Sequence, residues 1–587
     1  MPYGVIAVLA AAAVGFVFWR AWVCDDAFIT FRYVANCLAG YGPVFNVGER
    51  VQGFTHPLWF GLLLAGGLVF DVYAFAVAAG LALTAAAVLA LAWLVHGRNQ
   101  ATLVLIAAVG LLLASRSFVE FQTSGLETSL TNLLVLLLFA VVLRDARAAP
   151  ATVSAGLTAW LCSLLLLTRP DHLVICGPVL AWTCVQVVRR PARLRGFATA
   201  WVPLIAWYGF AAVYYGTPLP NTAYAKVALP LPVAAASGGR YVWDYAQHEP
   251  LHAAAVACAL LGGTVWSVRR VVGRRPGAPA VLCLMIGLWL DLVYVIGVGG
   301  DFMRGRFLLP LLVGATAIGA WCLTEVIGPR PREGLSPAVL GTAAVSEAGG
   351  RGVAAWRVGS PGVGVWRVGG LGVGVWRPLL LVAVLAAAGL ASLWDARARV
   401  ASQEAIDAAG GIADEHAWYA GRWNENRFRP PAQYPNPYTP LWVKVGDLAR
   451  RYAEAHGPVT IMWQAMGILP YRAGPKVRVI DQYGLTDAFI ARCPADPNSR
   501  IGHVDRDIPT AYLEARGVLG MLRNWGPRME AMDPTLAADA AAMARTARWD
   551  DPRDYQRWRN VQRMISGDVF TWERLSRIPA YTLGWLN

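Results

Sequence analysis

Apolar segments of near-transmembrane length recur along the chain and are separated by short polar connections. They cover residues 3–23, 74–95, 101–115, 128–143, 153–168, 171–188, 197–215, 251–267, 278–297, 307–326 and 378–394. A helix needs about 20 apolar residues to cross a bilayer, so the shorter segments would include flanking residues or lie in a thinned bilayer. The pattern predicts a polytopic α-helical membrane protein with about 11 transmembrane helices.

One further apolar run, residues 56–70, breaks the alternation of loops between the two sides of the membrane. Its roughly 14 apolar residues are too few to span a bilayer. We therefore expect an interfacial or re-entrant helix that packs against protein.

Composition and charge agree with this class of protein. Hydrophobic residues make up 56% of the 587 positions and charged residues only 15%, which excludes a soluble globular protein. The net charge of +14 needs no nucleic-acid partner, because basic residues are concentrated in every second connection, where the positive-inside rule places cytoplasmic loops. These clusters are Arg144/Arg147, Arg189/Arg190/Arg193/Arg195, Arg269/Arg270/Arg274/Arg275 and Arg330/Arg332.

The same orientation divides the chain into regions. Residues 1–327 form a predicted transmembrane catalytic region, and residues 328–377, which carry a ten-residue Trp-Arg repeat, form a low-complexity cytoplasmic linker. After a last transmembrane helix at 378–394, residues 395–587 form an extracytoplasmic domain. Strand-like runs at 459–463 and 477–481 and a helical stretch at 536–547 predict a small α/β or β-rich fold. Its many tryptophans either stack on sugar rings, which would make the domain glycan-binding, or fill its core.

Two adjacent acids, Asp25 and Asp26, directly follow the first apolar segment. Neighbouring carboxylates at the edge of a membrane are costly to desolvate. The structural alternative is a helix cap or a partner for Arg32. We favour a catalytic pair, because a carboxylate beside a like charge has a raised pKa that suits a base acting on a sugar hydroxyl. Carboxylate oxygens also bind Mg²⁺ or Ca²⁺, so a divalent cation stays open while no cofactor is certain.

A second outer motif, residues 299–310, contains Asp301, Arg304 and Arg306 among glycines. Arginine forks bind phosphate oxygens, and glycines let backbone amides approach the same anion. A lipid phosphate is the expected ligand, and Lys226, on the same side, is a second candidate contact. The alternatives are an ion pair between Asp301 and one of the arginines, and an ordinary snorkelling lysine.

Weaker candidates lie in the other outer loops. Glu127 and the Arg169/Asp171 pair either bind sugar hydroxyls or brace the first loop, and each also suits a helix cap. Polar residues that complete the predicted substrate site are Arg32, Glu49, Gln52, His56 and Asn221. Motifs typical of soluble-nucleotide chemistry do not occur in a suitable context.

Several of these stretches carry a family resemblance: Asp25-Asp26, residues 40–46 and 49–51, 300–303 with 305–306, and, in the tail, 480–487 and 501–503. They resemble the polyprenyl-phosphate-dependent glycosyltransferases of the GT-C fold, and more narrowly the terminal β-(1→2)-arabinofuranosyltransferases of actinobacterial cell walls. The resemblance implies a multi-pass plasma-membrane enzyme that transfers arabinofuranose from a decaprenyl-phosphate donor to a cell-wall glycan. It also implies that Asp25 or Asp26 is the catalytic carboxylate.

Residues 53–59 depart from the arabinan-capping enzymes, which leaves a different polyprenyl-phosphate sugar open as the donor. A lipid-linked-sugar flippase is the alternative from another class. It would need charges distributed through the depth of the membrane, whereas Asp291 is the main charge inside the apolar segments.

Overall fold

The computed structural model describes residues 1–98, 100–147, 154–226, 229–327, 403–420, 430–434, 438–496, 499–500, 502–509, 512–513 and 516. Its helices are α1 (Tyr3–Trp19), α2 (Asp25–Leu38), α3 (Pro57–Gly67), α4 (Val72–Val95), α5 (Ala101–Ala114), α6 (Arg116–Phe121), α7 (Thr128–Asp145), α8 (Ala155–Thr168), α9 (Leu173–Arg189), α10 (Leu194–Thr199), α11 (Val202–Tyr214), α12 (Asn221–Lys226), α13 (Leu231–His248), α14 (Pro250–Val272), α15 (Ala278–Gly297), α16 (Leu309–Ile327), α18 (Gln403–Ala408), α19 (Glu415–Ala420), α20 (Tyr438–His456) and α21 (Ile468–Ala473). Strands β1 (Val459–Trp463) and β2 (Val477–Asp481) complete the regular elements, with short 3-10 turns between them.

Every apolar segment predicted before residue 328 is helical, but fewer of these helices than expected can cross a membrane. Within the described residues, six are long and apolar enough, and α10 with α11, bent by 43°, would make a seventh. Helices α1, α5 and α8 are shorter: α1 ends at Trp19, before the end of its apolar run, and α5 and α8 have 14 residues each. The eleventh segment, 378–394, lies outside the described residues. The protein is a membrane protein with six or seven candidate spans in the described part.

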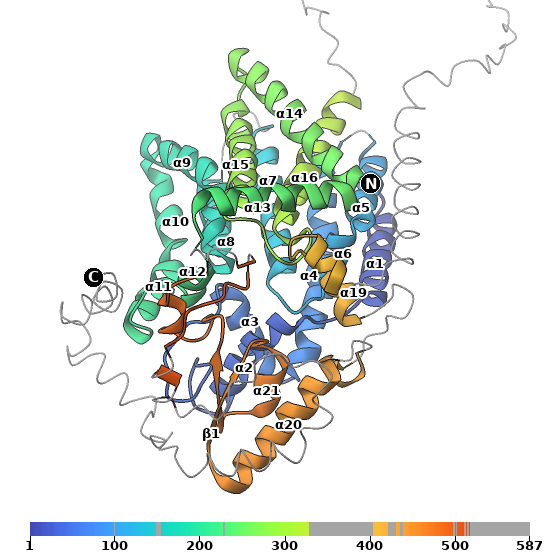
Figure 1. Ribbon diagram of the computed structural model, residues 1–587. Helices are drawn as coiled ribbons and strands as arrows, with labels where there is room; N and C mark the ends of the chain where they lie inside the picture. Colours follow the sequence, from blue (N-terminus) through green and yellow to red (C-terminus); the bar gives the residue numbers. More distant parts are fainter. Residues whose placement is uncertain are drawn as a thin grey trace, which may run out of the picture.

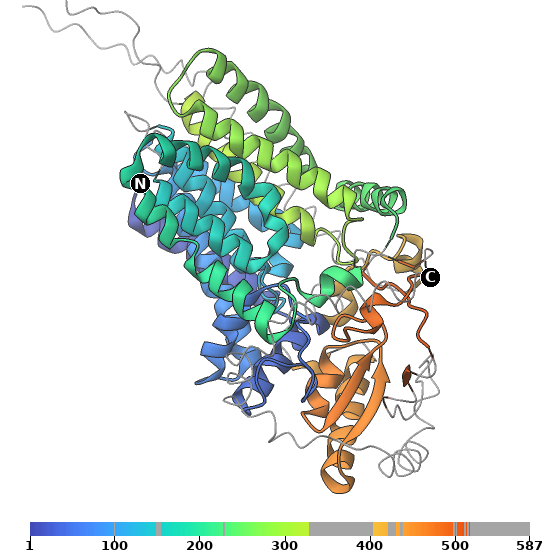
Figure 2. The ribbon, with the colours of Figure 1, turned by 90° about the vertical axis from the view of Figure 1, so that its left-hand side faces the viewer.

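Helices α7 and α16 form the centre of the bundle. In each of these two helices, 78% of the most apolar 18-residue stretch is buried inside the protein. The corresponding share for α14, at the periphery, is 22%. Glycines permit the closest approaches: a Cβ at Gly80 of α4 would overlap the Gln122 carbonyl, and one at Gly287 of α15 would overlap the Ile175 carbonyl of α9. Small residues at such crossings are typical of membrane helices. Figures 1 and 2 show the resulting bundle, in which α9, α14 and α15 stand side by side.

Helix α3 lies within the apolar run 56–70, which breaks the alternation of loops predicted from the sequence. It has 11 residues, too few to cross a bilayer. Trp59 and Leu63 are buried, and the Trp59 indole Nε1 donates to the Gly125 carbonyl at 2.9 Å. The helix therefore packs against protein, as expected, and its depth in the membrane stays a prediction.

The C-terminal region, residues 403–516 as described, packs against one end of the bundle beside α2 and α3 (Figure 1). Strands β1 and β2 form at the predicted residues and pair in parallel, with Val459 opposite Val477 and Trp463 opposite Asp481. Helix α21 connects them, as a parallel pair requires, and α20 packs on α21. The linker at 328–377 and the helical stretch at 536–547 lie outside the described residues.

The tryptophans of the C-terminal region that the structure describes belong to its packing. Trp463 is buried in β1, Trp418 stacks on Tyr438 with ring centroids 5.8 Å apart, and Trp442 contacts Tyr419 edge-on. Trp463 thus lies in the core, Trp418 and Trp442 are partly buried, and glycan binding by this domain stays a prediction.

Candidate active site

Asp25 holds the C-terminal region against the membrane bundle. Its carboxylate, at the first turn of α2, accepts hydrogen bonds from the amides of Gly467 at 3.0 Å and Ile468 at 2.7 Å, where α21 begins. The residue is only 5% exposed, and burial raises its pKa to about 7 against the opposing effect of these two bonds. Both oxygens of Asp25 are thus used in a structural contact.

Asp26 is oriented differently, because successive residues of a helix lie about 100° apart around its axis. It makes no hydrogen bond or ion pair with any residue that the structure describes, and it is partly exposed. Burial raises its pKa, while the nearby positive charges of Lys226 and Arg306 oppose the shift. Asp26 is therefore an uncommitted carboxylate that faces two cations.

The two cations come from separate loops. Arg306 is held by Asp301, with Nε 2.6 Å from the carboxylate Oδ2. The turn before it needs Gly305, whose φ of +72° and close contact with Ser117 leave no room for a side chain. Lys226, at the end of α12, lies 5.8 Å from the Phe302 ring, and burial lowers its pKa against the attraction of Asp26 and Asp301. Two positive groups and two acids thus share one small region.

A chain of polar side chains braces this region from the bundle side. His56 contacts Glu127 at 3.1 Å through Nδ1 and Thr30 at 2.8 Å through Nε2. Glu127 also meets Arg169 at 3.4 Å, and Arg169 pairs with Asp171 at 2.8 Å. Burial would raise the pKa of Glu127, but His56 and Arg169 outweigh it and hold the pKa well below the usual range. Glu127 is thus a fixed anion.

Sequence reasoning missed Glu415. The backbone before it forms a bridge with the Asp301 loop: the Ala413 amide donates to the Phe302 carbonyl at 2.7 Å, and the Arg304 amide donates to the Ala413 carbonyl at 3.0 Å. This places Glu415, 8% exposed, beside Asp26 and Asp301 without a hydrogen bond to any described residue. Burial and the neighbouring acids raise its pKa well above the usual value. The available signal was the run Asp414-Glu415-His416, three titratable residues in succession.

Arg304 is not where the sequence analysis placed it. Its guanidinium is bound by both carboxylate oxygens of Asp244, at 2.7 and 3.1 Å, and approaches Asp414 at 3.8 Å. The adjacent Arg306 faces the Asp26 region, because the glycine turn between the two arginines separates their directions. Arg304 therefore joins α13 to the C-terminal region, and its guanidinium is already occupied by carboxylates.

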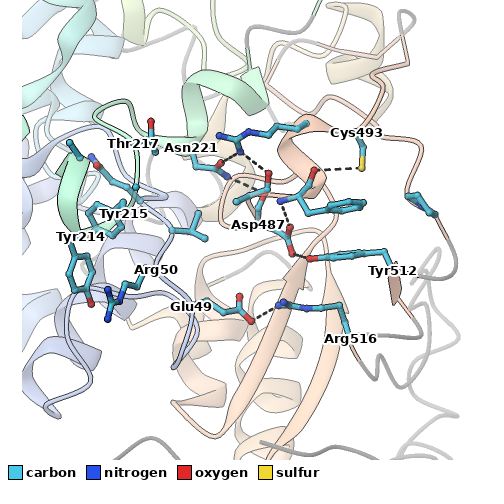
Figure 3. A pocket seen from close by; sticks show the side chains of 18 of the residues that line it. Glu49, Arg50, Tyr214, Tyr215, Thr217, Asn221, Asp487, Cys493, Tyr512 and Arg516 are labelled. Carbon is cyan, nitrogen blue, oxygen red and sulfur yellow. Dashed lines mark hydrogen bonds and ion pairs between the residues drawn. The ribbon is translucent and has the colours of Figure 1, made fainter. Parts of the chain in front are cut away.

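The remaining predicted residues hold loops together. Arg32 is buried and donates to the Phe45 and Val477 carbonyls, each at 2.7 Å, and to the Pro470 carbonyl. Asn221 donates to the Gly484 carbonyl at 2.7 Å. Glu49, Gln52 and Asn221 line a cavity of about 700 Å³ between the bundle and the C-terminal region (Figure 3).

A smaller cavity of about 30 Å³ adjoins the polar brace and is lined by Glu127, Arg169 and Arg306 among others. A metal ion would need several ligands in one place. Among the described residues, no group of three or more His, Cys, Asp or Glu side chains is arranged to hold one.

Comparison with known proteins gives these residues a context. Residues 427–525 match the AftB family C-terminal domain. A terminal β-(1→2)-arabinofuranosyltransferase of Mycobacterium tuberculosis is 27% identical over 96% of this chain and 94% of its own. The enzyme of the same name from Corynebacterium glutamicum is 33% identical over 51% of this chain, and that match spans about half of the relative, 48%. No solved structure matches the chain. Over most of its length the chain is therefore similar to the terminal β-(1→2)-arabinofuranosyltransferases.

Proposed function

We propose that the protein transfers an arabinofuranosyl unit from a polyprenyl-phosphate donor to a cell-wall glycan on the extracytoplasmic side of the membrane. The observation that carries this proposal is Asp26, an uncommitted, partly exposed carboxylate that faces Arg306 and Lys226. The names of the two relatives supply the sugar and the linkage.

The cations are suited to the leaving group. In the reaction, the bond between the anomeric carbon and the donor phosphate oxygen breaks, and its electron pair remains on the lipid phosphate. Arg306 and Lys226 stabilise that charge, and they do so strongly because the site is partly shielded from water. Asp301 holds the Arg306 guanidinium in place at 2.6 Å.

Asp26 is suited to the acceptor. As the new bond forms between the acceptor oxygen and the anomeric carbon, the hydroxyl proton needs a base, whichever face of the sugar is attacked. A carboxylate with a raised pKa takes this proton more readily than an ordinary one. Asp25 cannot serve as well, because both of its oxygens accept backbone hydrogen bonds.

The distribution of arginine supports an extracytoplasmic site. Helix α7 begins beside Glu127 at the site and has Arg144 in its last turn, and α9 begins near Asp171 and ends at Arg189. The basic ends therefore lie on the opposite side of the bundle from Asp26. Basic loops stay in the cytoplasm, which leaves the site and the C-terminal region outside.

The test is transfer by the full chain reconstituted in liposomes and supplied with a panel of decaprenyl-phosphate sugars and arabinan oligosaccharides. We expect an arabinofuranosyl product with a β-(1→2) linkage, identified by mass and NMR. Transfer of a different sugar would show that the donor is not a polyprenyl-phosphate arabinofuranose. Movement of the donor to the other leaflet without a product would replace the enzyme by a flippase.

Glu415 gives this site a predicted pH signature. Its raised pKa keeps the carboxyl neutral to a higher pH than an ordinary glutamate, and once the carboxyl ionises the new negative charge repels both Asp26 and the donor phosphate. We expect kcat/KM for the donor to fall at alkaline pH by about three- to tenfold in the wild type and to stay level in Glu415→Gln, which is neutral throughout. An alkaline decline that is identical in both proteins contradicts this role.

A further inference from the structure

We propose that the cavity of about 700 Å³ between α11, the first loop and the C-terminal region binds the acceptor glycan, a few sugar residues back from the end that receives the new unit. The inference rests on the proposed function, and it assigns a second binding region to it. The cavity volume lies within the range of about 300–1,000 Å³ that is typical of ligand sites.

Flat side chains form two sides of the cavity (Figure 3). On one side, Arg50 lies over the Tyr214 ring at 5.0 Å, next to Tyr215. On the other, Phe489 and Tyr512 stack with centroids 4.1 Å apart, and Arg516 extends the stack over Tyr512 at 5.6 Å. Aromatic rings with a polar tip suit the mixed apolar and hydroxyl faces of sugar rings.

The charges that line the cavity favour a neutral polar occupant. Three acids and three arginines contribute to the lining: Glu49, Asp487, Asp507, Arg50, Arg492 and Arg516. Several already pair with one another or with neighbouring groups, as Asp487 does with the Tyr512 hydroxyl at 2.7 Å. A phosphate would need a clear excess of cations, and a prenyl chain would need a lining without charges. An oligosaccharide needs neither.

Two segments connect the cavity to the reacting region. Helix α12 begins with Asn221 in the cavity and ends with Lys226 beside Asp26, about 7.5 Å farther along the helix axis. The first loop runs from Gln52 in the cavity to His56 in the polar brace. A glycan seated between the two aromatic sides can therefore extend its end toward Asp26 over a distance of a few sugar residues.

Acceptor length provides the test. We expect Arg50→Ala and Tyr214→Ala to raise KM for a long arabinan oligosaccharide by about tenfold, as loss of an aromatic or arginine contact often does, with a smaller effect for a short glycoside and none on donor KM. Arg451→Ala is the matched control, because Arg451 is exposed on α20, away from the cavity. Equal KM values for long and short acceptors, or a rise in donor KM instead, overturn the inference.

A binding measurement separates this inference from the proposed function. Calorimetric titration of the oligosaccharide into Asp26→Asn without donor should show binding that weakens about tenfold when Tyr214→Ala is added. If the wild type transfers no sugar but this binding persists, the proposed function fails and the glycan site stands. If transfer occurs and the titration shows no binding, or binding that Tyr214→Ala leaves unchanged, the glycan site fails alone.

Discussion

Asp26→Asn is expected to reduce sugar transfer about a thousandfold or more while the protein remains folded. Asparagine has nearly the same shape but cannot accept the hydroxyl proton, and it removes a negative charge that faces Arg306 and Lys226. Folding should not suffer, because Asp26 bonds to no described residue and a neutral side chain avoids the cost of burying its charge, which is the largest influence on its pKa. The measurement is initial rate in liposomes together with thermal unfolding in detergent.

Asp505→Asn is the matched control, since Asp505 is exposed in the C-terminal region and should keep the wild-type rate. An Asp26→Asn protein with full activity removes Asp26 from the chemistry. An inactive protein with a much lower unfolding temperature makes Asp26 a structural residue instead.

Gly467→Ala should have the largest effect on stability, a loss of about 2–4 kcal/mol in the free energy of unfolding. A Cβ at this position would overlap the backbone carbonyl and the carboxyl carbon of Asp25. Neither group can move cheaply, because both belong to the first turn of α2 and to the contact with α21. Transfer should also fall by about a hundredfold, since a shift of about 1 Å at Asp25 displaces the adjacent Asp26.

Thermal unfolding and limited proteolysis of the C-terminal region would measure this effect. Gly262→Ala provides the comparison: Gly262 lies within α14, and a Cβ added there would meet no other group within 4 Å, so alanine should be neutral or slightly stabilising. Wild-type unfolding of Gly467→Ala would mean that the contact between Asp25 and α21 does not hold the region in place.

Sequence patterns were sufficient for the apolar helices before residue 328 and for the two strands, because periodicity and apolar length are local properties. They did not predict the polar helices α2 and α13, which lie in segments expected to be outer loops. The expected number of spans was higher than the six or seven helices of sufficient length in the described residues, partly because an apolar run continued into a turn after Trp19. No local pattern predicted the packing of the C-terminal region against α2, since the backbone amides of Gly467 and Ile468 that Asp25 binds are more than 400 residues away.

The proximity of the candidate residues was predicted in part. Asp26 and Arg306 lie near each other, as expected of the two loops, but the sequence did not show which member of each pair faces the cluster, because this depends on a 100° step in α2 and on the turn at Gly305. Arg304 and Arg306 look equivalent in the sequence, yet Asp244 binds the first and Asp301 the second. Glu415 could not be assigned, because a backbone bridge between distant segments positions it.

The contact between the first loop and the C-terminal region also limits how relatives can be recombined. Asn46 donates to the Val479 carbonyl at 3.0 Å and accepts from the Val479 amide at 2.9 Å, next to the Arg32 and Asp25 contacts. A chimera that takes its C-terminal region from one of the relatives would have to include residues 25–56 of that relative as well. We therefore expect a chimera to adopt the acceptor preference of a relative only when it contains both residues 25–56 and the C-terminal region of that relative.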